Sequence, residues 1–429
     1  MAEIGAILQS FQRFGVHLGL ERIQKLLADL GNPHYSVPVI HVAGTNGKGS
    51  VCAYLSAVLT EAGYRVGRYT SPHLIDWTER ICLNEQPIST DALRELLLLV
   101  KAAIPEDCDD SPTQFEVITA AAWLYFQHQQ VDVAVVEVGL GGRLDATNVS
   151  DRPLVSIITS LSREHWQNLG PTLADIAREK AGILKAGCPA VVGQFPAEAE
   201  AVVKQRIQEM ECPTVWVKPA KRVKEAWAEY EGIKYPLPLL GDIQLSNSAI
   251  AIATLQILRS QGWKISDDVI ASGMAKTTWH GRLQWTHWHN HRLLIDGAHN
   301  PAAAIALRQY VDTLNTPVTW VMGILSTKDH ADIFEAILRP CDRLYLVPVP
   351  DHSSADPDAL AIIAENCCPE LRDCLTFPNL EAGLQAATSS NLAESSNRLI
   401  VLCGSLYLVG YFLKQNRLDI KEYSAKSDG

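Results

Sequence analysis

Short apolar runs alternate along the first half of the chain with longer segments whose apolar residues recur at helical spacing. Strands are predicted at residues 37–44, 131–139, 154–161 and 188–193, and helices at 51–62, 113–127, 173–185 and 246–260. These strands are apolar on both faces, which is typical of a parallel sheet covered by helices on both sides. The pattern therefore predicts an α/β fold with a doubly wound, mostly parallel sheet.

The same alternation returns in the last third of the chain. Strands are predicted at 292–297, 318–323, 343–349 and 398–404, and helices at 302–314, 330–338, 358–367 and 380–388. Between the two series, residues 214–240 indicate a small β-excursion or surface insertion, and the Trp- and His-rich stretch 277–291 has no clear period. We place a domain junction there and expect domains at 1–285 and 286–429, the second a smaller, Rossmann-like α/β domain.

The composition is that of an ordinary globular protein, with 47% apolar and 20% charged positions among 429 residues. The net charge of −11 argues against nucleic-acid binding and means that an anionic ligand needs a local positive site. No apolar run approaches the length of a membrane span, and the N-terminal residues lack a signal-peptide pattern. The cysteines include no CxxC pair, so we expect reduced thiols and a cytoplasmic location. A monomer is the default expectation for the oligomeric state.

The stretch HVAGTNGKGS (41–50) joins the first predicted strand to the first predicted helix. Its glycines let backbone N–H groups approach phosphate oxygens, and the start of the helix adds partial positive charge. Lys48 can neutralise phosphate charge, and the hydroxyl of Ser50 can ligate Mg²⁺. The stretch therefore predicts a site for a nucleoside triphosphate, formed by Gly44, Thr45, Asn46, Gly47, Lys48, Gly49 and Ser50.

The spacing within this loop departs from the motif G-x-x-x-x-G-K-[ST] of common kinases and GTPases. Gly44 and Gly47 are closer together than in that motif, and Gly49 separates Lys48 from Ser50. A kinase or motor NTPase is therefore a poor match. The alternative without any ligand is a plain glycine-rich turn.

Further motifs follow one another along almost the whole chain. They are GLERIQKLLADLGNP (19–33), HVAGTNGKGSV (41–51), TSPHL (70–74), ERI (79–81), TQFE (113–116), VEVGLGGRLDATN (136–148), REKAGI (178–183), DGAHNP (296–301) and CGSLYLVG (403–410). Each is weak alone, but in this order they resemble the dihydrofolate synthase/folylpolyglutamate synthase family of the Mur-ligase superfamily. The resemblance implies an ATP-dependent ligase whose P-loop-type first domain binds the nucleotide and whose second domain closes on it.

The resemblance implies a Mg²⁺ site formed by Ser50, Ser71, Glu137 and His165. Glu137 ends a buried predicted strand, where α/β sheets place ligands, although a structural ion pair would also explain it. The resemblance further implies that Lys180 is carbamylated and that the catalytic residues are Lys48, Glu137, His165 and Lys180. From the residues alone, Lys180 would be a helix-surface lysine paired with Glu179 or Asp175, and His165 a packed or surface histidine.

For ATP, the resemblance adds residues beyond the loop, namely Asn247, Arg282, Asp296 and His299, with Lys328 and Asp329 as weaker candidates. The pterin-containing substrate is expected to contact Thr113, Gln114, Phe115, Glu116, Leu144, Asp145 and Ala146. Without the resemblance, Asp296 would be an N-cap-like residue and Phe115 a core residue. Three positions depart from the family pattern: Glu164 replaces Asp, Ile243 replaces His, and His280 replaces Pro.

The implied reaction forms an amide. A carboxylate of dihydropteroate, or the terminal γ-carboxylate of a tetrahydrofolate, attacks the γ-phosphate of ATP, and the amine of L-glutamate then displaces phosphate from the acyl phosphate. Mg²⁺ and the co-substrate ATP are expected, and a monovalent cation is an optional addition. The expected partners are these small molecules, with no nucleic acid and no membrane.

Three alternatives outside this family remain: a cell-wall Mur ligase acting on a UDP-linked sugar, a phosphoryl-transfer kinase or motor NTPase, and an inactive binding module. Closer alternatives are a folylpolyglutamate synthase without the second activity and another Mur-type amide ligase. A cell-wall ligase would carry an additional N-terminal domain, for which the loop at residue 41 leaves no room, and the four catalytic candidates disfavour an inactive module. The sequence leaves open whether both activities are present, how long a glutamate chain is made, whether Lys180 is carbamylated, and the oligomeric state.

Overall fold

The computed structural model describes residues 2–11, 17–105, 110–389 and 398–416. The chain divides into two compact units: the first comprises Met1–Pro238 and Ile243–Thr278, and the second Leu239–Asp242 and Trp279–Gly429. The division falls a few residues before the expected boundary at 285/286. The reason is local, because the strand that starts at Gln284 pairs along its length with the next strand of the second unit.

The first unit is built on an eight-stranded sheet. In spatial order its strands are β4 (Gln86–Pro87), β3 (Ile81–Leu83), β2 (Val66–Tyr69), β5 (Val133–Glu137), β1 (Val39–Ala43), β6 (Val155–Ile158), β7 (Ala190–Val192) and β8 (Thr214–Trp216). The neighbouring strands β2, β5, β1, β6, β7 and β8 pair in parallel, and only β3 runs in the opposite direction, pairing antiparallel with both β2 and β4. Every residue of β1, β2, β5, β6 and β7 is buried, as expected for strands covered on both faces.

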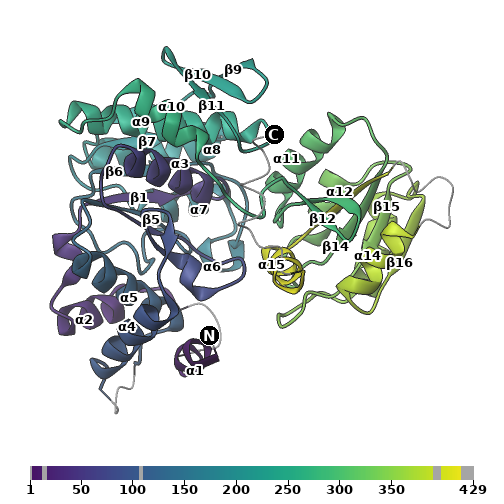
Figure 1. Cartoon of the computed structure of the whole chain (residues 1–429), viewed down its shortest axis with the longest axis horizontal. Coiled ribbons are helices and arrows are strands. Elements are labelled where there is room, and N and C mark those ends of the chain that lie inside the picture. Colours follow the sequence, from purple (N-terminus) through teal and green to yellow (C-terminus); the bar gives the residue numbers. More distant parts are fainter. Residues whose placement is uncertain (1, 12–16, 106–109, 390–397, 417–429) are drawn as a thin grey trace. The chain divides into compact units, whose positions relative to one another are not determined.

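Helices cover both faces of this sheet (Figure 1). One face carries α3 (Lys48–Glu61), α9 (Ile243–Ser260) and α10 (Asp267–Ala275), and the other carries α4 (Thr90–Ala102), α5 (Gln114–His128), α7 (Leu173–Ala181) and α8 (Ala197–Glu209). Smaller helices complete the unit: α1 (Ala2–Gln9), α2 (Glu21–Asp29), η1 (Pro33–Ser36), η2 (Trp77–Arg80) and α6 (Trp166–Leu169).

The weakly patterned region 214–240 contains the predicted β-excursion. It is a separate antiparallel sheet of β9 (Lys221–Lys224), β10 (Trp227–Tyr230) and β11 (Ile233–Pro236), and β11 packs against α10. The region also supplies β8, which extends the main sheet by pairing with β7. Because β8 is short and largely exposed, its sequence lacks the continuous apolar run of the inner strands.

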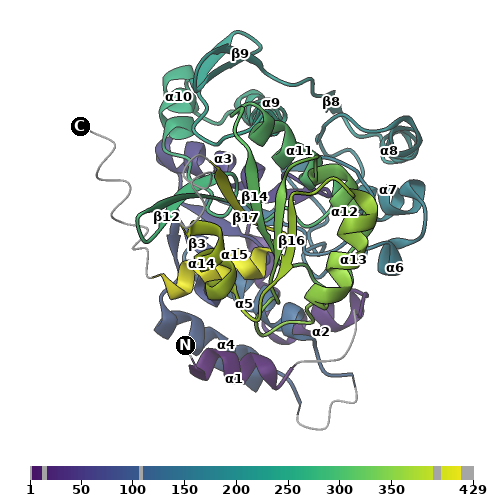
Figure 2. The same cartoon turned by 90° about the vertical axis from the view of Figure 1, so that its right-hand side faces the viewer.

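The second unit repeats the layered architecture on a six-stranded sheet. In spatial order its strands are β12 (Gln284–Trp288), β13 (His291–Ile295), β17 (Leu399–Cys403), β14 (Val318–Met322), β15 (Arg343–Leu346) and β16 (Asp373–Thr376), and all but β12 are parallel. One face packs against α11 (Pro301–Asp312), α12 (His330–Ile337) and α13 (Pro357–Cys367), the other against α14 (Leu380–Thr388) and α15 (Leu406–Gln415) (Figure 2).

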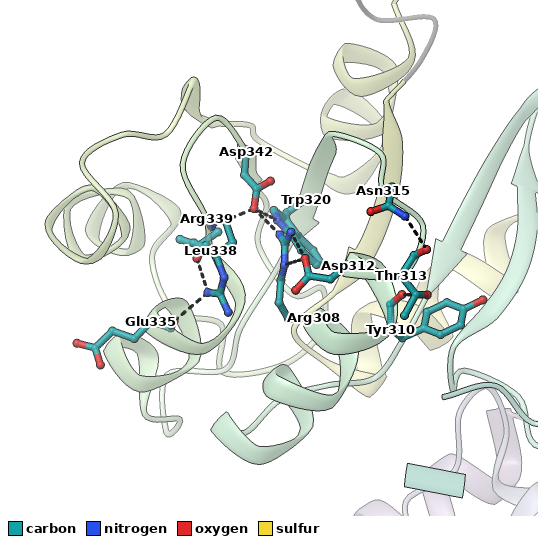
Figure 3. A network of polar contacts seen from close by, with 10 residues as sticks. All are labelled: Arg308, Tyr310, Asp312, Thr313, Asn315, Trp320, Glu335, Leu338, Arg339 and Asp342. Atoms are coloured by element: carbon teal, nitrogen blue, oxygen red, sulfur yellow. Dashed lines mark hydrogen bonds and ion pairs between the residues drawn. The ribbon is translucent and has the colours of Figure 1, made fainter. Parts of the chain in front are cut away.

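A network of buried charges joins α11 to the amino end of β15 (Figure 3). Arg308 donates from Nε to Asp312 Oδ1 at 2.7 Å and from Nη1 to Asp342 Oδ2 at 2.8 Å. Asp342 also accepts from Trp320 Nε1 at 2.9 Å and from the backbone N–H of Arg339 at 3.1 Å. Burial raises the pKa of Asp342, and the indole N–H and the guanidinium oppose that rise. The network therefore fixes a helix to its sheet through fully paired groups.

The expected fold class is confirmed by this architecture, with a large, mostly parallel sheet in the first unit and a smaller α/β unit after it. Strands β3, β4, β12 and β16 were not predicted, because they are short or partly exposed. The inner strand β2 was also not predicted, because Gly67 and Arg68 interrupt its four-residue apolar pattern although all four residues are buried. Among the described residues, each helix is too short or too polar to cross a membrane.

Candidate active site

Three central strands of the first unit deliver their carboxyl ends to one edge of the sheet. Strand β1 pairs with β5 on one side and with β6 on the other, so the residues after Ala43, Glu137 and Ile158 come together. Ligands of open α/β sheets bind at such carboxyl edges. The predicted phosphate loop follows β1, and the predicted metal ligand Glu137 ends β5.

The phosphate loop needs its glycines for both conformation and space. Gly44 and Gly47 have φ angles of 145° and 88°, in the region that L-residues with side chains rarely adopt. A Cβ atom would overlap Thr159 Oγ1 at the first position and Asn247 Oδ1 at the second. The loop is held by backbone and hydroxyl groups that follow β6, since Thr45 N donates to Ser160 O at 2.8 Å. The tight backbone at the start of α3 is therefore enclosed by the segment after β6 and by α9.

Two lysines converge on one carbonyl oxygen of this loop. Lys48 Nζ donates to Gly44 O at 3.0 Å and to Thr45 O at 3.1 Å, and Lys180 Nζ donates to Gly44 O at 2.8 Å. Lys180 is 5% exposed, and burial, assisted by the charge of Lys48, lowers its pKa to about 7. A large share of Lys180 is therefore the neutral amine at neutral pH.

The helix-surface alternative for Lys180 is wrong. The side chain points into the protein, and the acidic residues suggested as its partners are engaged elsewhere. Glu179 Oε1 accepts from Arg143 at 2.8 Å, and Asp175 accepts from Thr172 Oγ1 at 2.6 Å in the cap of α7. The sequence of α7 alone does not show this, because a lysine is ordinarily assigned to the exposed face of a helix and not to a buried face formed by alanine and isoleucine.

The predicted Mg²⁺ ligands are oxygen-rich and lie at the same edge. Glu137 is 6% exposed, and its Oε2 accepts from the backbone N–H of Ser71 at 3.1 Å. Ser50 lies in the first turn of α3, where its Oγ accepts from Gln244 Nε2 at 3.4 Å. Carboxylate and hydroxyl oxygens suit a hard cation that keeps several waters, so these residues fit Mg²⁺.

His165 differs from the other predicted metal ligands. It adopts φ 52°, its side chain is 43% exposed, and Nε2 lies 3.8 Å from Glu164 Oε1. Among the described residues, no three His, Cys, Asp or Glu side chains converge as a metal site. The predicted set contains only two residues of these types, so a bound Mg²⁺ would depend on hydroxyl oxygens and water as well.

Helix α9 contributes a buried polar group that the sequence analysis missed. Gln244 Oε1 accepts from Asn247 Nδ2 at 3.1 Å and from Tyr54 OH at 3.4 Å, while its Nε2 faces Ser50. Gln244 and Asn247 are both 4% exposed. Their spacing of three at the start of the helix was the available signal, since it places two amides on one face.

The expected substrate residues Thr113 and Glu116 form the N-cap of α5. Thr113 Oγ1 accepts from Glu116 N at 3.2 Å, and Glu116 Oε2 accepts from Thr113 N at 2.6 Å, which is a capping box. Glu116 also pairs with Arg22 at 3.1 Å. Gln114 and Phe115 are partly buried in the first turn, and the ring of Phe115 lies against Gly139 at the end of β5.

The other expected substrate residues lie on the loop between β5 and β6. Leu144 is partly exposed, whereas Asp145 and Ala146 are buried. The carboxylate of Asp145 accepts from Leu140 N at 2.8 Å and from Thr147 N at 3.0 Å, so its oxygens hold the loop itself. Burial raises the pKa of Asp145, and these hydrogen bonds oppose the rise.

In the second unit, the predicted ATP contacts gather at the end of β13. Asp296 is buried, and its two oxygens accept from Leu283 N at 2.8 Å and Ala298 N at 2.7 Å. Arg282 lies against Gly297, whose carbonyl is 2.7 Å from His299 Nδ1. The N-cap alternative for Asp296 is wrong, because Asn300 caps α11 through Ala303 N at 2.9 Å.

Comparison with known proteins adds a second line of evidence. The model of the Mur ligase middle domain matches residues 42–255, and that of the dihydrofolate synthetase C-terminal domain matches 282–415. The chain is 35% identical over 426 residues to folylpolyglutamate synthase from Lacticaseibacillus casei, covering 95% of this chain and 96% of the relative. The chain belongs to the dihydrofolate synthase/folylpolyglutamate synthase family. The expected family is thereby confirmed.

Other members of this family span the same length. Dihydrofolate synthetase from Saccharomyces cerevisiae is 34% identical, with 93% of this chain and 98% of the relative covered. Among solved structures, Mycobacterium tuberculosis folylpolyglutamate synthase complexed with ADP and AMPPCP has a TM-score of 0.84 at 30% identity, covering 96% of this chain and 98% of that chain. Escherichia coli FolC in complex with DHPP and ADP has a TM-score of 0.83 at 31% identity, covering 97% and 98%.

The positions that depart from the family pattern can now be placed. Glu164 is 8% exposed, and its charge raises the pKa of Lys180, so its longer side chain still acts on that lysine. Ile243 begins α9 and is 39% exposed, while the amide that follows it faces inward. His280 lies in the turn before β12. Glu164 therefore retains the acidic group of the family pattern, whereas Ile243 carries no polar group and leaves the buried amide to Gln244.

Proposed function

We propose that this chain ligates L-glutamate to dihydropteroate, forming dihydrofolate, and to the γ-carboxylate of tetrahydrofolates, extending a polyglutamate chain. Membership of the family makes it an ATP-dependent acid–amino-acid ligase. The observation that carries the proposal is the phosphate loop with Lys48 and buried Lys180 on one carbonyl, beside Glu137 at the same sheet edge.

The proposed reaction has two steps. A substrate carboxylate oxygen attacks the γ-phosphorus of ATP, forming an acyl phosphate and breaking the bond to ADP. The amine of L-glutamate then attacks the acyl carbon, losing a proton as the amide forms and inorganic phosphate leaves. The loop Gly44–Ser50 would cradle the phosphates, and Lys48 would offset charge on the transferring group, where most catalysis of phosphoryl transfer lies.

We assign the Mg²⁺ site to oxygen and imidazole donors near the phosphate loop, namely Ser50, Ser71, Glu137 and His165. The contact between Ser71 and Glu137 and the oxygen-rich donor set support the assignment. A bound Mg²⁺ would supply charge neutralisation on the nucleotide phosphates. Asn247, which lies against Gly47, would contact the nucleotide from α9.

We also propose that Lys180 is carbamylated. Its neutral amine would attack CO₂ and lose a proton, giving an anionic carbamate in place of an ammonium. Its burial and lowered pKa of about 7 support this, because only the neutral amine is nucleophilic. Lys48 would then face a compensating negative charge rather than a second ammonium.

Substrate and second-unit assignments complete the proposal. The pterin would lie along Thr113–Glu116 and Leu144–Ala146, with Phe115 offering a ring face and Leu144 a partly exposed apolar side chain. Arg282, Asp296 and His299 would contact ATP from the second unit. A monovalent cation, a monomeric state and a cytoplasmic location stay predictions.

A chain with the polyglutamylating activity alone is the second candidate. The named relatives include a folylpolyglutamate synthase, a dihydrofolate synthetase and the Bacillus subtilis dihydrofolate synthase/folylpolyglutamate synthase at 32% identity. Since relatives of both kinds are similarly distant, the substrate range needs a direct measurement.

The deciding experiment measures phosphate release from ATP with L-glutamate plus either dihydropteroate or tetrahydrofolate. We expect glutamate-dependent release with both substrates, and a kcat/KM about 10³-fold lower for the variant Lys48→Met. Release with tetrahydrofolate alone would leave polyglutamylation as the only activity. Absence of glutamate-dependent release with either substrate would overturn the proposal.

A further inference from the structure

A chain of buried hydrogen bonds runs from strand β1 to the loop that follows β5. His41 Nε2 lies 2.9 Å from Thr147 Oγ1, and that hydroxyl donates to Asp145 Oδ1 at 2.6 Å. All three side chains are buried, at 3%, 2% and 3% exposure. His41 is on the strand that leads into the phosphate loop, and neither it nor Thr147 has a part in the chemistry proposed above.

The direction of each hydrogen bond follows from the groups involved. The carboxylate of Asp145 can only accept, so the single proton of Thr147 Oγ1 is committed to it. His41 must therefore carry its proton on Nε2 and donate to Thr147. Burial, with the charge of Lys185 as a smaller cause, lowers the pKa of His41 to about 3, so the ring stays neutral at physiological pH. Only the neutral His41 ring with its proton on Nε2 therefore completes the chain of hydrogen bonds.

The loop held by this chain is tied to α7 as well. Asn148 Nδ2 donates to Gly182 O at 3.3 Å, just after the end of α7. A Cβ at Gly142 would lie 3.1 Å from the carbonyl oxygen of Lys180, which shows how closely the two backbones approach. The loop therefore sits between the strand that carries the phosphate loop and the helix that carries Lys180.

We propose that His41 and Thr147 are positioning residues, which set the loop carrying Leu144–Ala146 in register with the phosphate loop and so hold the pterin-contacting residues in place for substrate binding. This inference rests on the proposed function, because it needs a substrate on that loop. These hydrogen bonds fix the loop through buried side chains and leave Leu144 partly exposed.

The test compares variants that remove or keep each donor. Thr147→Val removes the hydroxyl at nearly constant volume, and Thr147→Ser keeps it. His41→Leu removes the donor, and His41→Gln keeps an N–H on a neutral side chain. We expect Thr147→Val and His41→Leu to raise KM for the folate or pteroate substrate about tenfold. We expect KM for ATP to change less than about twofold, with the conserving variants close to wild type.

A double-mutant cycle separates the proposed chain from general loosening of the core. In Thr147→Val, His41 has lost its acceptor, so adding His41→Leu should raise the substrate KM no further. Thr254→Val is the matched control, because Thr254 is fully buried and its Oγ1 donates to Ile250 O within α9. We expect that control to leave both KM values unchanged.

Parallel rises in both KM values, full additivity, or failure of His41→Gln and Thr147→Ser to restore the substrate KM would overturn the inference. A wild-type protein without glutamate-dependent turnover would instead overturn the proposed function. In that case the ¹⁵N chemical shifts of His41 still decide whether Nε2 carries the proton. A tautomer protonated on Nδ1 would contradict the hydrogen bond from His41 to Thr147.

Discussion

Each unit contains buried or partly buried cationic side chains at one end of its sheet, and the two sets are hydrogen-bonded in different ways. In the first unit, Lys48 and Lys180 donate to backbone carbonyl oxygens at the carboxyl edge. In the second, Arg308 donates to the carboxylate of Asp342, which immediately precedes β15 at the amino edge. Both units have the same layered architecture, so fold alone does not decide which set carries chemistry.

The two units differ in how far the positive charge of these side chains is compensated by carboxylates. A guanidinium paired with two carboxylates has its charge compensated within the protein, which suits a structural role. A carbonyl oxygen offers only partial negative charge, so it does not compensate a lysine as a carboxylate would, and burial, assisted by the charge of Lys48, lowers the pKa of Lys180 to about 7. Uncompensated charge at the ligand-binding edge of a sheet indicates a site for an anion.

The largest effect is expected from Lys48→Met. Removing a charge that stabilises the transferring phosphoryl group should lower kcat/KM by about 10³-fold, while the free energy of unfolding stays close to wild type. Phosphate-release kinetics and urea unfolding measure the two quantities. A large loss of stability without a loss of turnover would show that Lys48 is structural and would break the comparison.

Lys180→Met should lower kcat by about 10²-fold and leave the protein as stable or more stable. The folded-state pKa of about 7 lies below the unfolded value near 10.5. Between these pH values the unfolded chain binds the proton and the folded chain does not, so wild-type stability rises with pH. In CO₂-free buffer, the stability gain of Lys180→Met should therefore be larger at pH 6 than at pH 9.

Carbamylation itself is detected separately by ¹³C NMR of protein equilibrated with ¹³C-labelled CO₂. A carbamate signal is expected from wild type and should be missing from Lys180→Met. If the signal persists in the variant, the modification lies on another amine.

Arg308→Met tests the other half of the comparison. It leaves Asp342 buried without its guanidinium partner, which should cost about 3 kcal/mol of unfolding free energy in the second unit. Below the unfolding temperature, kcat should change less than about twofold. Urea unfolding followed by the fluorescence of Trp320 reports the loss, and a selective effect on KM for ATP would argue that this network also serves the ligand site.

The smallest effect is expected from Glu164→Asp, which restores the residue usual in the family. Because Glu164 already acts on Lys180 with the same charge, turnover should change less than about threefold. A tenfold gain or loss in kcat would show that the extra methylene sets the geometry next to His165. Glu164→Gln is the companion variant, because it removes the charge and keeps the length.

Most inner strands and the phosphate loop could be predicted because their signals are local, whereas β2 (VGRY) lacks a continuous apolar run and was missed. Strands such as β5 are continuous apolar runs, and Gly44 and Gly47 mark a turn that other residues cannot form. The stretch TQFE illustrates the limit, since Thr113 and Glu116 match a capping box as well as a substrate motif, and the structure shows the cap.

The missed contributions depend on contacts between residues far apart in sequence. Thr159 and Gln244 support the phosphate loop from other elements, and Thr147 meets His41 across more than a hundred residues. Periodicity reports which face of an element is apolar, but it does not report which buried polar group meets which. The burial of Lys180 was hidden for the same reason, because its helix is amphipathic and a lysine is normally assigned to the exposed face.

The segment Leu239–Asp242 belongs to the second unit although residues of the first unit precede and follow it. Leu240 packs against the core of the second unit. A gene fragment that starts at Trp279 would therefore encode this unit without a part of its own interior. In chimaeras between relatives, the natural module for exchange is discontinuous, so a recombination partner must bring the short upstream segment together with the C-terminal one.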